Sequence, residues 1–267
     1  MINPMQIALI KKDLRNITSN KRLFSVMLIV PLALAVVLPS MFILITIFVP
    51  KSVSDFQSDF QSLLDLLPQS AQTGDPGHMV MNLVLNNIMP VIFLMIPILT
   101  ASVMASSSFV GEKEKRTLET LLYCPLSLKQ IFNAKILASF IMSMMVSFIS
   151  FITMILVVET AMQLTMGSMI LPDIGWLIMM LLVSPAVSLI AIILIVRGSA
   201  KAQSMEESQQ RGVFLILPVI LLAVGQFTGI MLVNSWLLLG LGIICAVIAL
   251  LAMKSSFRKF NYETLFK

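Results

Sequence analysis

The chain carries little charge for its length. Asp, Glu, Lys and Arg make up only 12 % of its 267 residues, whereas 58 % are hydrophobic and the mean hydropathy is +0.98. Soluble domains average about 25 % charged residues. This composition excludes a soluble protein and indicates an integral membrane protein.

Residues that support catalysis or metal binding are scarce. The single histidine, His78, and the two cysteines, Cys124 and Cys245, lie far apart in the sequence, and the 21 methionines are scattered without a His or Cys cluster. We therefore expect no metal site and no catalytic residue. Residues 206–211 spell E-E-x-x-x-R, which resembles the first motif of the intramembrane CAAX-type proteases, but those enzymes need histidines within their spans.

A nucleotide-binding loop is also missing. The pattern G-x-x-x-x-G-K-[ST], which cradles nucleotide phosphates, occurs nowhere in the chain. We therefore expect no cofactor in this chain. If the protein works in an ATP-driven process, ATP and Mg²⁺ are bound by a separate ATPase chain.

Long hydrophobic runs are what the sequence does contain. Their lengths fit the roughly 20 residues that a helix needs to cross a bilayer core of about 30 Å. The expected spans are residues 23–49, 88–110, 131–158, 174–196, 213–233 and 236–253. We predict one all-α transmembrane domain over residues 1–267, with six helices and a second span that is kinked or broken at Pro90 and Pro97.

The basic residues lie on one side of these spans. Of the 18 Lys and Arg residues, 17 fall in four segments, residues 1–22, 111–135, 197–211 and 254–267, and only Lys51 falls elsewhere. Because Lys and Arg favour the cytoplasmic side, we expect both termini in the cytoplasm. The same distribution indicates that the net charge of +5 interacts with a lipid bilayer and not with nucleic acid.

Ionisable side chains are expected only at the ends of the spans. With Lys135 assigned to the loop before the third span, none remains inside the six spans, and Glu159 and Asp173 fall at the outer ends of the third and fourth. Transport driven by protons or sodium needs ionisable groups along the path. We therefore expect no such coupling in this chain alone.

Amphipathic segments flank the first span. In residues 1–22, four apolar residues recur at helical spacing among basic ones: Ile7, Ile10, Leu14 and Ile17. They predict a cytoplasmic helix on the membrane surface, with a plain basic flank as the alternative. In the external loop, residues 50–87, apolar residues between 55 and 67 predict a short helix that is either a packing lid or a gate for substrate.

Small and polar residues recur within two spans. The third span has serines four residues apart, and the fifth has a G-x-x-x-G motif that contains a glutamine: Ser139, Ser143 and Ser147, then Gly225, Gln226 and Gly229. Small residues at this spacing let helix backbones approach closely. These positions are candidates for helix packing or for lining a translocation path.

The sequence is organised around residues 111–135, GEKEKRTLETLLYCPLSLKQIFNAK, which form an extended charged stretch between hydrophobic runs. Its first part predicts a short amphipathic helix that begins at Gly111. Pro125 ends that helix, because proline lacks an N–H group and clashes with the preceding turn. Ser127 and Gln130 then form an S-x-x-Q capping box that begins the next helix.

This stretch resembles the cytoplasmic segment of ABC-2 type transporter permeases. Their usual form is close to G-E-[KR]-E-x-x-T-L-E-x-L-L-x-x-P-[LIV]-S with a lysine further on, here Lys135. Residues 204–210 resemble the second cytoplasmic loop of the family, and residues 257–263 resemble its tail, although Tyr-Glu stands where Arg-Glu is more usual. The interfacial helix, the six spans and the inward termini also fit.

The resemblance implies a permease subunit in a prokaryotic inner or plasma membrane. Two permease subunits, identical or different, would pair with two copies of a cytoplasmic ABC ATPase, and the segment at 111–130 would meet a groove on that ATPase. The resemblance implies six ATPase-coupling candidates: Glu112, Glu114, Arg116, Leu118, Glu119 and Leu122.

Two functions remain open from the sequence. The first is export or efflux, with sodium, a peptide or antibiotic, a lipid-linked glycan or a hydrophobic drug as cargo. The second is a membrane subunit for assembly, immunity or sensing that transports nothing. Dependence of a co-purifying ATPase on Glu114 and Arg116 separates the two.

Overall fold

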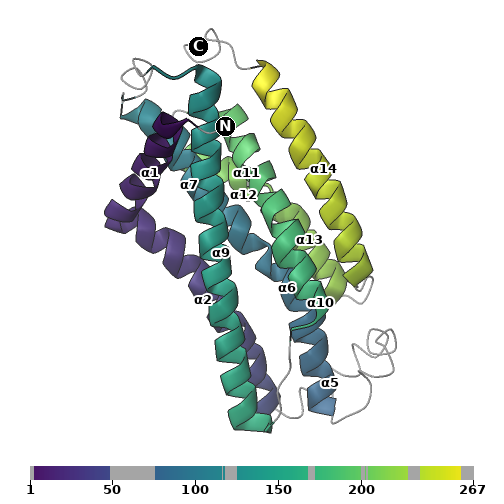
Figure 1. Ribbon diagram of the computed structural model, residues 1–267. Helices are drawn as coiled ribbons and strands as arrows, with labels where there is room; N and C mark the ends of the chain where they lie inside the picture. Colours follow the sequence, from purple (N-terminus) through teal and green to yellow (C-terminus); the bar gives the residue numbers. More distant parts are fainter. Residues whose placement is uncertain are drawn as a thin grey trace.

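A computed structural model describes residues 3–48, 76–115, 117, 125–167, 172–199, 202, 204–227 and 235–259. Within these ranges every regular element is a helix (Figure 1). Six helical segments are long and apolar enough to cross a membrane: Leu23–Ile45, Val80–Glu114, Leu128–Leu164, Ile174–Gly198, Met205–Phe227 and Ser235–Ser255. The prediction of an all-α protein with six spans is confirmed. The short helix expected between 55 and 67 lies outside the described residues.

The N-terminal segment forms a helix of its own. Helix α1 (Pro4–Ser19) is separated from α2 (Lys21–Phe48) by Asn20, whose backbone is extended. The buried face of α1 consists of four residues at helical spacing: Gln6, Leu9, Asp13 and Ile17. Of the predicted apolar stripe, Ile17 lies on this buried face, whereas Ile7 is 56 % exposed.

The second span is broken, as its prolines predicted. It consists of α5 (Pro76–Leu83), the π-helix η2 (Val84–Ile88), α6 (Met89–Phe93) and, after a turn at Leu94, α7 (Met95–Glu114). The two irregular points, η2 and the turn at Leu94, lie just before Pro90 and Pro97. Neither proline has the N–H group that would donate the next hydrogen bond of a regular helix. The helix begins at Pro76, well before the expected start near residue 88.

Helix α9 (Leu128–Met166) is the longest helix described. The predicted capping box is present: the Ser127 N–H donates to Gln130 Oε1 at 2.9 Å, and the Gln130 N–H donates to Ser127 Oγ at 3.4 Å. At 1.5 Å per residue, α9 is about 58 Å long, so it extends beyond a bilayer core of about 30 Å. It ends at Gly167, whose φ of +63° suits glycine.

The fourth span contains a second π-helix. Helices α10 (Ile174–Ile178) and α11 (Ser184–Gly198) are joined by η3 (Met179–Val183), and Pro185 follows η3 directly in the first turn of α11. The Trp176 indole N–H donates to the Leu85 carbonyl oxygen at 3.1 Å, which ties α10 to η2. Single π-helical turns occur often at functional sites.

The last three helices are α12 (Met205–Val213), α13 (Ile216–Phe227) and α14 (Ser235–Lys259). Ser204 begins α12, since its Oγ accepts the Glu207 N–H at 3.2 Å. Helix α12 is short and polar and packs against α7 and α11. The expected fifth span began at residue 213, but the helical segment begins eight residues earlier and turns at Phe214 and Leu215.

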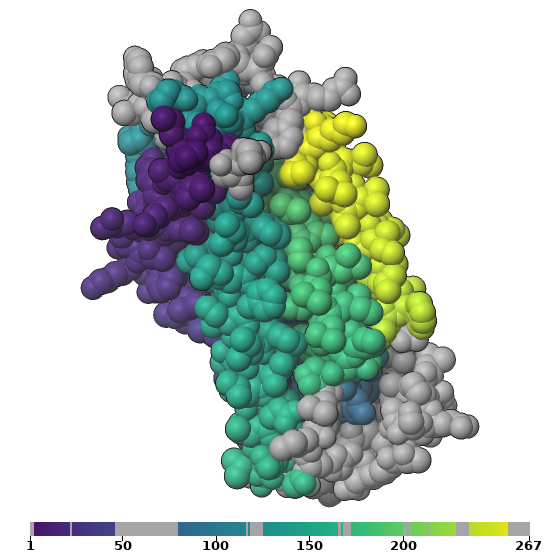
Figure 2. Space-filling model, in the orientation of Figure 1, coloured from purple at the N-terminus to yellow at the C-terminus, as the bar shows by residue number. Residues whose placement is uncertain are grey.

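Helices α7 and α9 form the centre of the molecule, with α1 and α2 on one side and α11 to α14 on the other (Figure 1). The space-filling view shows α9 running the length of the visible face between α1 and α2, in purple, and α10 and α11, in green (Figure 2). We call the end that holds α1, Lys115 and Leu128 the basic end. The opposite end holds α5 and Met166.

Candidate functional site

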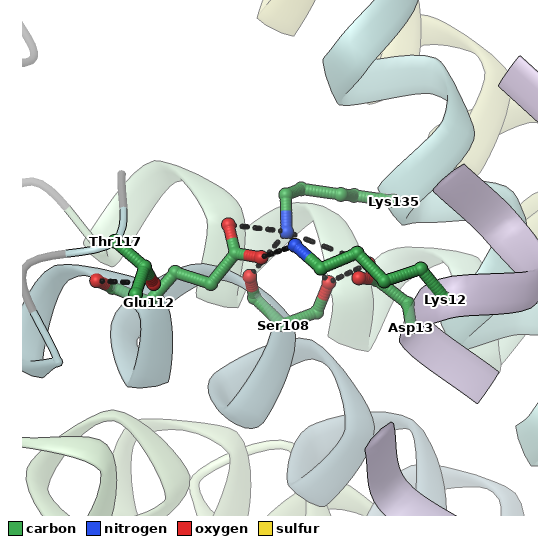
Figure 3. Close-up of polar contacts among 6 residues, drawn as sticks. All are labelled: Lys12, Asp13, Ser108, Glu112, Thr117 and Lys135. Carbon is green, nitrogen blue, oxygen red and sulfur yellow. Dashed lines mark hydrogen bonds and ion pairs between the residues drawn. The ribbon is translucent and has the colours of Figure 1, made fainter. Parts of the chain in front are cut away.

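Lys135 is the centre of a buried polar cluster at the basic end (Figure 3). It lies two turns into α9, and its side chain is 3 % exposed. Its Nζ donates to the Ser108 carbonyl oxygen at 2.6 Å and to Ser108 Oγ at 3.3 Å. The expectation that no ionisable side chain lies within the spans is therefore wrong, because α9 begins before Lys135 and places it inside the helix packing.

Asp13 brings α1 into the same cluster. Its Oδ2 accepts a hydrogen bond from Ser108 Oγ at 2.7 Å and lies 3.4 Å from Lys135 Nζ. The side chain of Asp13 is only 4 % exposed, so this ion pair is shielded from water. One lysine thereby connects α1, α7 and α9.

Glu112, in the last turn of α7, is the second carboxylate that faces Lys135. Its Oε2 lies 2.8 Å from Lys135 Nζ, at an angle that does not suit a hydrogen bond, so the attraction is ionic. Its Oε1 accepts a hydrogen bond from Lys12 Nζ at 3.0 Å, and Lys12 reaches out to the surface. Two buried carboxylates thus face two ammonium groups, which offsets the cost of burying the charges.

The chain leaves α7 from this cluster. The Glu112 carbonyl oxygen accepts the Thr117 N–H at 2.9 Å and the Thr117 hydroxyl at 3.3 Å. Residues Gly111–Glu114 form the last turn of α7, and not the first turn of a separate loop helix as expected. These two hydrogen bonds tie Thr117 to the last turn of α7.

The six predicted coupling residues differ in burial and in whether the structure describes them. Glu112 is buried in the ion cluster, so it does not lie on a solvent-facing polar side. Glu114 is exposed, and its Oε2 accepts the Met205 N–H at 3.3 Å at the start of α12. The other four lie outside the described residues: Arg116, Leu118, Glu119 and Leu122.

Helix α12 packs closely on α7 next to the cluster. Ser106 Oγ donates to Ser208 Oγ at 3.1 Å, and both side chains are buried. A Cβ at Gly212 would collide with Ser102 Oγ, so only glycine permits this approach. Helix α12 is therefore held against α7 at the basic end.

The predicted serines of α9 are fully buried between helices. Ser143 Oγ donates to the Pro97 carbonyl oxygen at 3.0 Å and lies 3.0 Å from Thr100 Oγ1 and 3.2 Å from Ser188 Oγ. These bonds join α9 to α7 and α11. Ser147 bonds back to the Ser143 carbonyl oxygen, whereas Ser139 Oγ has no hydrogen-bond partner among the described residues.

The G-x-x-x-G motif of the fifth span is described only in part. Among the described residues, a Cβ added at Gly225 would meet no atom within 4 Å, and Gly229 lies outside them. Gln226 is buried, and its Nε2 donates to the Asn87 carbonyl oxygen at 3.0 Å. This hydrogen bond holds α13 against the second span.

Sequence reasoning did not single out Asp13. The signal was present, since Asp13 is the only acidic residue among residues 1–22. It also lies at helical spacing with Leu9 and Ile17, on the face that is buried. A lone carboxylate on an apolar stripe indicates a buried partner, and here that partner is Lys135.

The described residues contain no group of three or more His, Cys, Asp or Glu side chains that could hold a metal ion. Cys245 is a half-buried free thiol on α14, and Cys124 lies outside the described residues. The chemistry of the cluster is therefore that of fixed charges and hydrogen bonds that connect helices.

The fold and the site define a multi-pass helical membrane protein whose helices α1, α7 and α9 are joined at one end by a buried ion cluster. A family model described as ABC-2 family transporter protein matches residues 60–205, more than half of the chain. The chain belongs to this family of membrane transport proteins. Comparisons with curated proteins and with solved structures gave no match.

Proposed function

We propose that this chain is the permease subunit of an ATP-binding cassette exporter and that a separate cytoplasmic ATPase drives it. The observation that carries the proposal is the buried cluster of Asp13, Glu112 and Lys135. It connects the segment after α7, which resembles the ATPase-contacting segment of the family, to α1 and α9.

The cluster supplies a physical route for coupling. Glu112 is bonded to Thr117 on the loop side and to Lys135 on the α9 side, so displacement of the loop is passed to α9. Buried ion pairs resist separation because each separated charge would lie unpaired in a medium of low dielectric constant. The three helices would therefore move together instead of sliding past one another.

The segment from Glu114 onward is proposed to contact the ATPase. Glu114 is exposed beside α12, and Arg116, Leu118, Glu119 and Leu122 follow it in the sequence. A short amphipathic segment can occupy a groove on a partner, with its charges setting the register. In this proposal two ATPase copies bind ATP and Mg²⁺, and a second permease subunit completes the path.

Orientation is part of the same proposal. The basic end faces the cytoplasm, as the distribution of Lys and Arg favours. Both termini and the coupling surface then lie on the side where ATP is available. The end with Met166 and α5 faces outward, and the protein resides in a prokaryotic inner or plasma membrane.

Purification in mild detergent tests the proposal. We expect an ATPase with a P-loop to co-purify, and we expect Glu114→Ala combined with Arg116→Ala to lower its copy number or its turnover severalfold. Glu206→Gln, which changes an exposed carboxylate on α12 at the same end, is the control. Recovery of this chain without any ATPase would overturn the proposal and favour a membrane subunit that transports nothing.

A further inference from the structure

The end opposite the ion cluster contains a small pocket that neither the family nor the coupling proposal explains. Its volume is about 20 Å³, and it lies between η2, α9 and the start of α10. It is lined by apolar residues and by three polar ones, with these members: Leu85, Asn86, Met154, Ile155, Val158, Glu159, Pro172 and Trp176.

The polar groups of two lining residues are already used. The Trp176 indole N–H donates to the Leu85 carbonyl oxygen at 3.1 Å. Asn86 Nδ2 donates to Asn82 Oδ1 at 2.8 Å, and Asn86 Oδ1 accepts the Asp173 N–H at 3.2 Å. These bonds fix the walls of the pocket and leave neither side chain with an obvious role toward a ligand.

Glu159 differs from both. Its Oε1 is buried and has no hydrogen-bond partner among the described residues, whereas the residue as a whole is half-buried. A buried carboxylate oxygen without a partner is costly, because it loses its bonds to water and gains none in return. The atom of the pocket that still lacks a hydrogen bond is therefore a carboxylate oxygen of Glu159, which accepts hydrogen bonds. A cationic donor would match it in both hydrogen bonding and charge.

The size and walls of the pocket limit that donor. A cavity needs about 10–15 Å³ of such volume to hold one water-sized group, so this pocket has room for one ammonium group. Leu156 on α9 and Leu177 on α10 are exposed, and they follow the lining residues Ile155 and Trp176 in the sequence. An alkyl chain that leaves the pocket would meet such apolar surface.

We propose that Glu159 binds the primary ammonium group of an amphiphile, with Trp176 forming one wall of the site. The same chemistry occurs in a free alkylamine and in the headgroup of phosphatidylethanolamine. The proposal concerns this chain alone and does not depend on coupling to an ATPase, so either one can fail without the other.

Trp176 gives a direct readout. The chain has two tryptophans, and Trp236 is 79 % exposed, so Trp236→Phe leaves Trp176 as the single reporter. In this background, in mild detergent at neutral pH, titration with dodecylamine is expected to change the fluorescence saturably. Dodecanol and dodecyltrimethylammonium should not, because one lacks the charge and the other lacks N–H donors.

Glu159→Gln keeps the shape of the side chain and removes its charge. We expect it to weaken dodecylamine binding by about tenfold or more, as for loss of a hydrogen bond to a charged group. Asp173→Asn is the matched control, since Asp173 is an exposed carboxylate at the same end of the molecule. Gel filtration and circular dichroism confirm that each variant is folded.

Lipid nanodiscs separate the two sources of the amine. If the fluorescence differs between phosphatidylethanolamine and phosphatidylcholine discs, and Glu159→Gln removes the difference, the bound amine is a lipid headgroup. If only dodecylamine changes the fluorescence, the bound amine is a free one. The proposal is overturned if neither amine gives a saturable response, if Glu159→Gln binds as well as the parent, or if the trimethylammonium compound binds equally well.

Discussion

Lys135 and Asp13 are 122 residues apart in the sequence, yet Lys135 Nζ lies 3.4 Å from Asp13 Oδ2 in a part of the protein that water hardly reaches. This pair joins the N-terminal helix to the longest helix described. Ser108 and Glu112 add α7 to the same contact. The N-terminal segment is therefore part of the helix packing and not merely a basic flank of the first span.

Replacing Lys135 should destabilise the protein strongly. Lys135→Met leaves Asp13 without its charged partner and Glu112 with only Lys12, and removal of one partner from a buried ion pair costs about 3–5 kcal/mol. We expect a clear fall in the thermal unfolding midpoint of the detergent-solubilised protein, followed by circular dichroism. Lys129→Met, which alters an exposed lysine on the same helix, should leave the midpoint nearly unchanged.

The effects of changing Asp13 and Lys135 should not add. After Lys135→Met, the Asp13 carboxylate no longer has its ion-pair partner, so Asp13→Asn should then cost less or should stabilise. A double-mutant cycle should give a coupling free energy of about 0.5–3 kcal/mol. Additive changes in the unfolding free energy would show that the two residues act independently.

Two neighbouring serines of α9 should respond differently to alanine. Ser143 makes hydrogen bonds to the Pro97 carbonyl oxygen, Thr100 and Ser188, so Ser143→Ala should cost about 1–3 kcal/mol, since it also leaves partners unpaired. Ser139 is equally buried but has no partner for its hydroxyl among the described residues. Ser139→Ala should therefore be neutral or stabilising, which unfolding midpoints of both variants will check.

Gly212 should not tolerate a methyl group. Its Cβ would collide with Ser102 Oγ, so Gly212→Ala should force α12 away from α7 and lower the unfolding midpoint. Ser102→Gly should restore part of the loss by removing the colliding atom.

Gly240→Ala is the control for this prediction, because a Cβ there meets no atom within 4 Å. Alanine favours a helix over glycine by about 1 kcal/mol, so this variant should be equally stable or more stable. If Gly212→Ala behaves in the same way, the close approach of α12 to α7 does not contribute to stability.

The sequence by itself determined the features that depend on neighbouring residues. Runs of apolar side chains set the six spans, because a helix is the form in which a backbone satisfies its own hydrogen bonds in lipid. Pro90 and Pro97 broke the second span because each lacks an N–H group, and Ser127 with Gln130 began α9 through a local capping box.

The sequence was less informative about where helices begin and which faces they bury. The prediction of a loop over residues 76–87 is wrong, because helix begins at Pro76. Lysine favours water, so the sequence predicts Lys135 in the loop, but its partners Asp13 and Ser108 hold it inside the helix packing. A specific partner across the fold thus overrules the average preference of a single residue.

Only the tertiary structure decided which polar residues meet. Asp13, Ser108, Glu112 and Lys135 come from three helices, and the contacts between them depend on how α1 and α9 pack against α7. The same holds for the Glu159 pocket, which exists because η2, α9 and α10 converge there. Periodicity along one chain describes each helix separately, whereas the relative placement of helices follows from long-range packing that no local pattern contains.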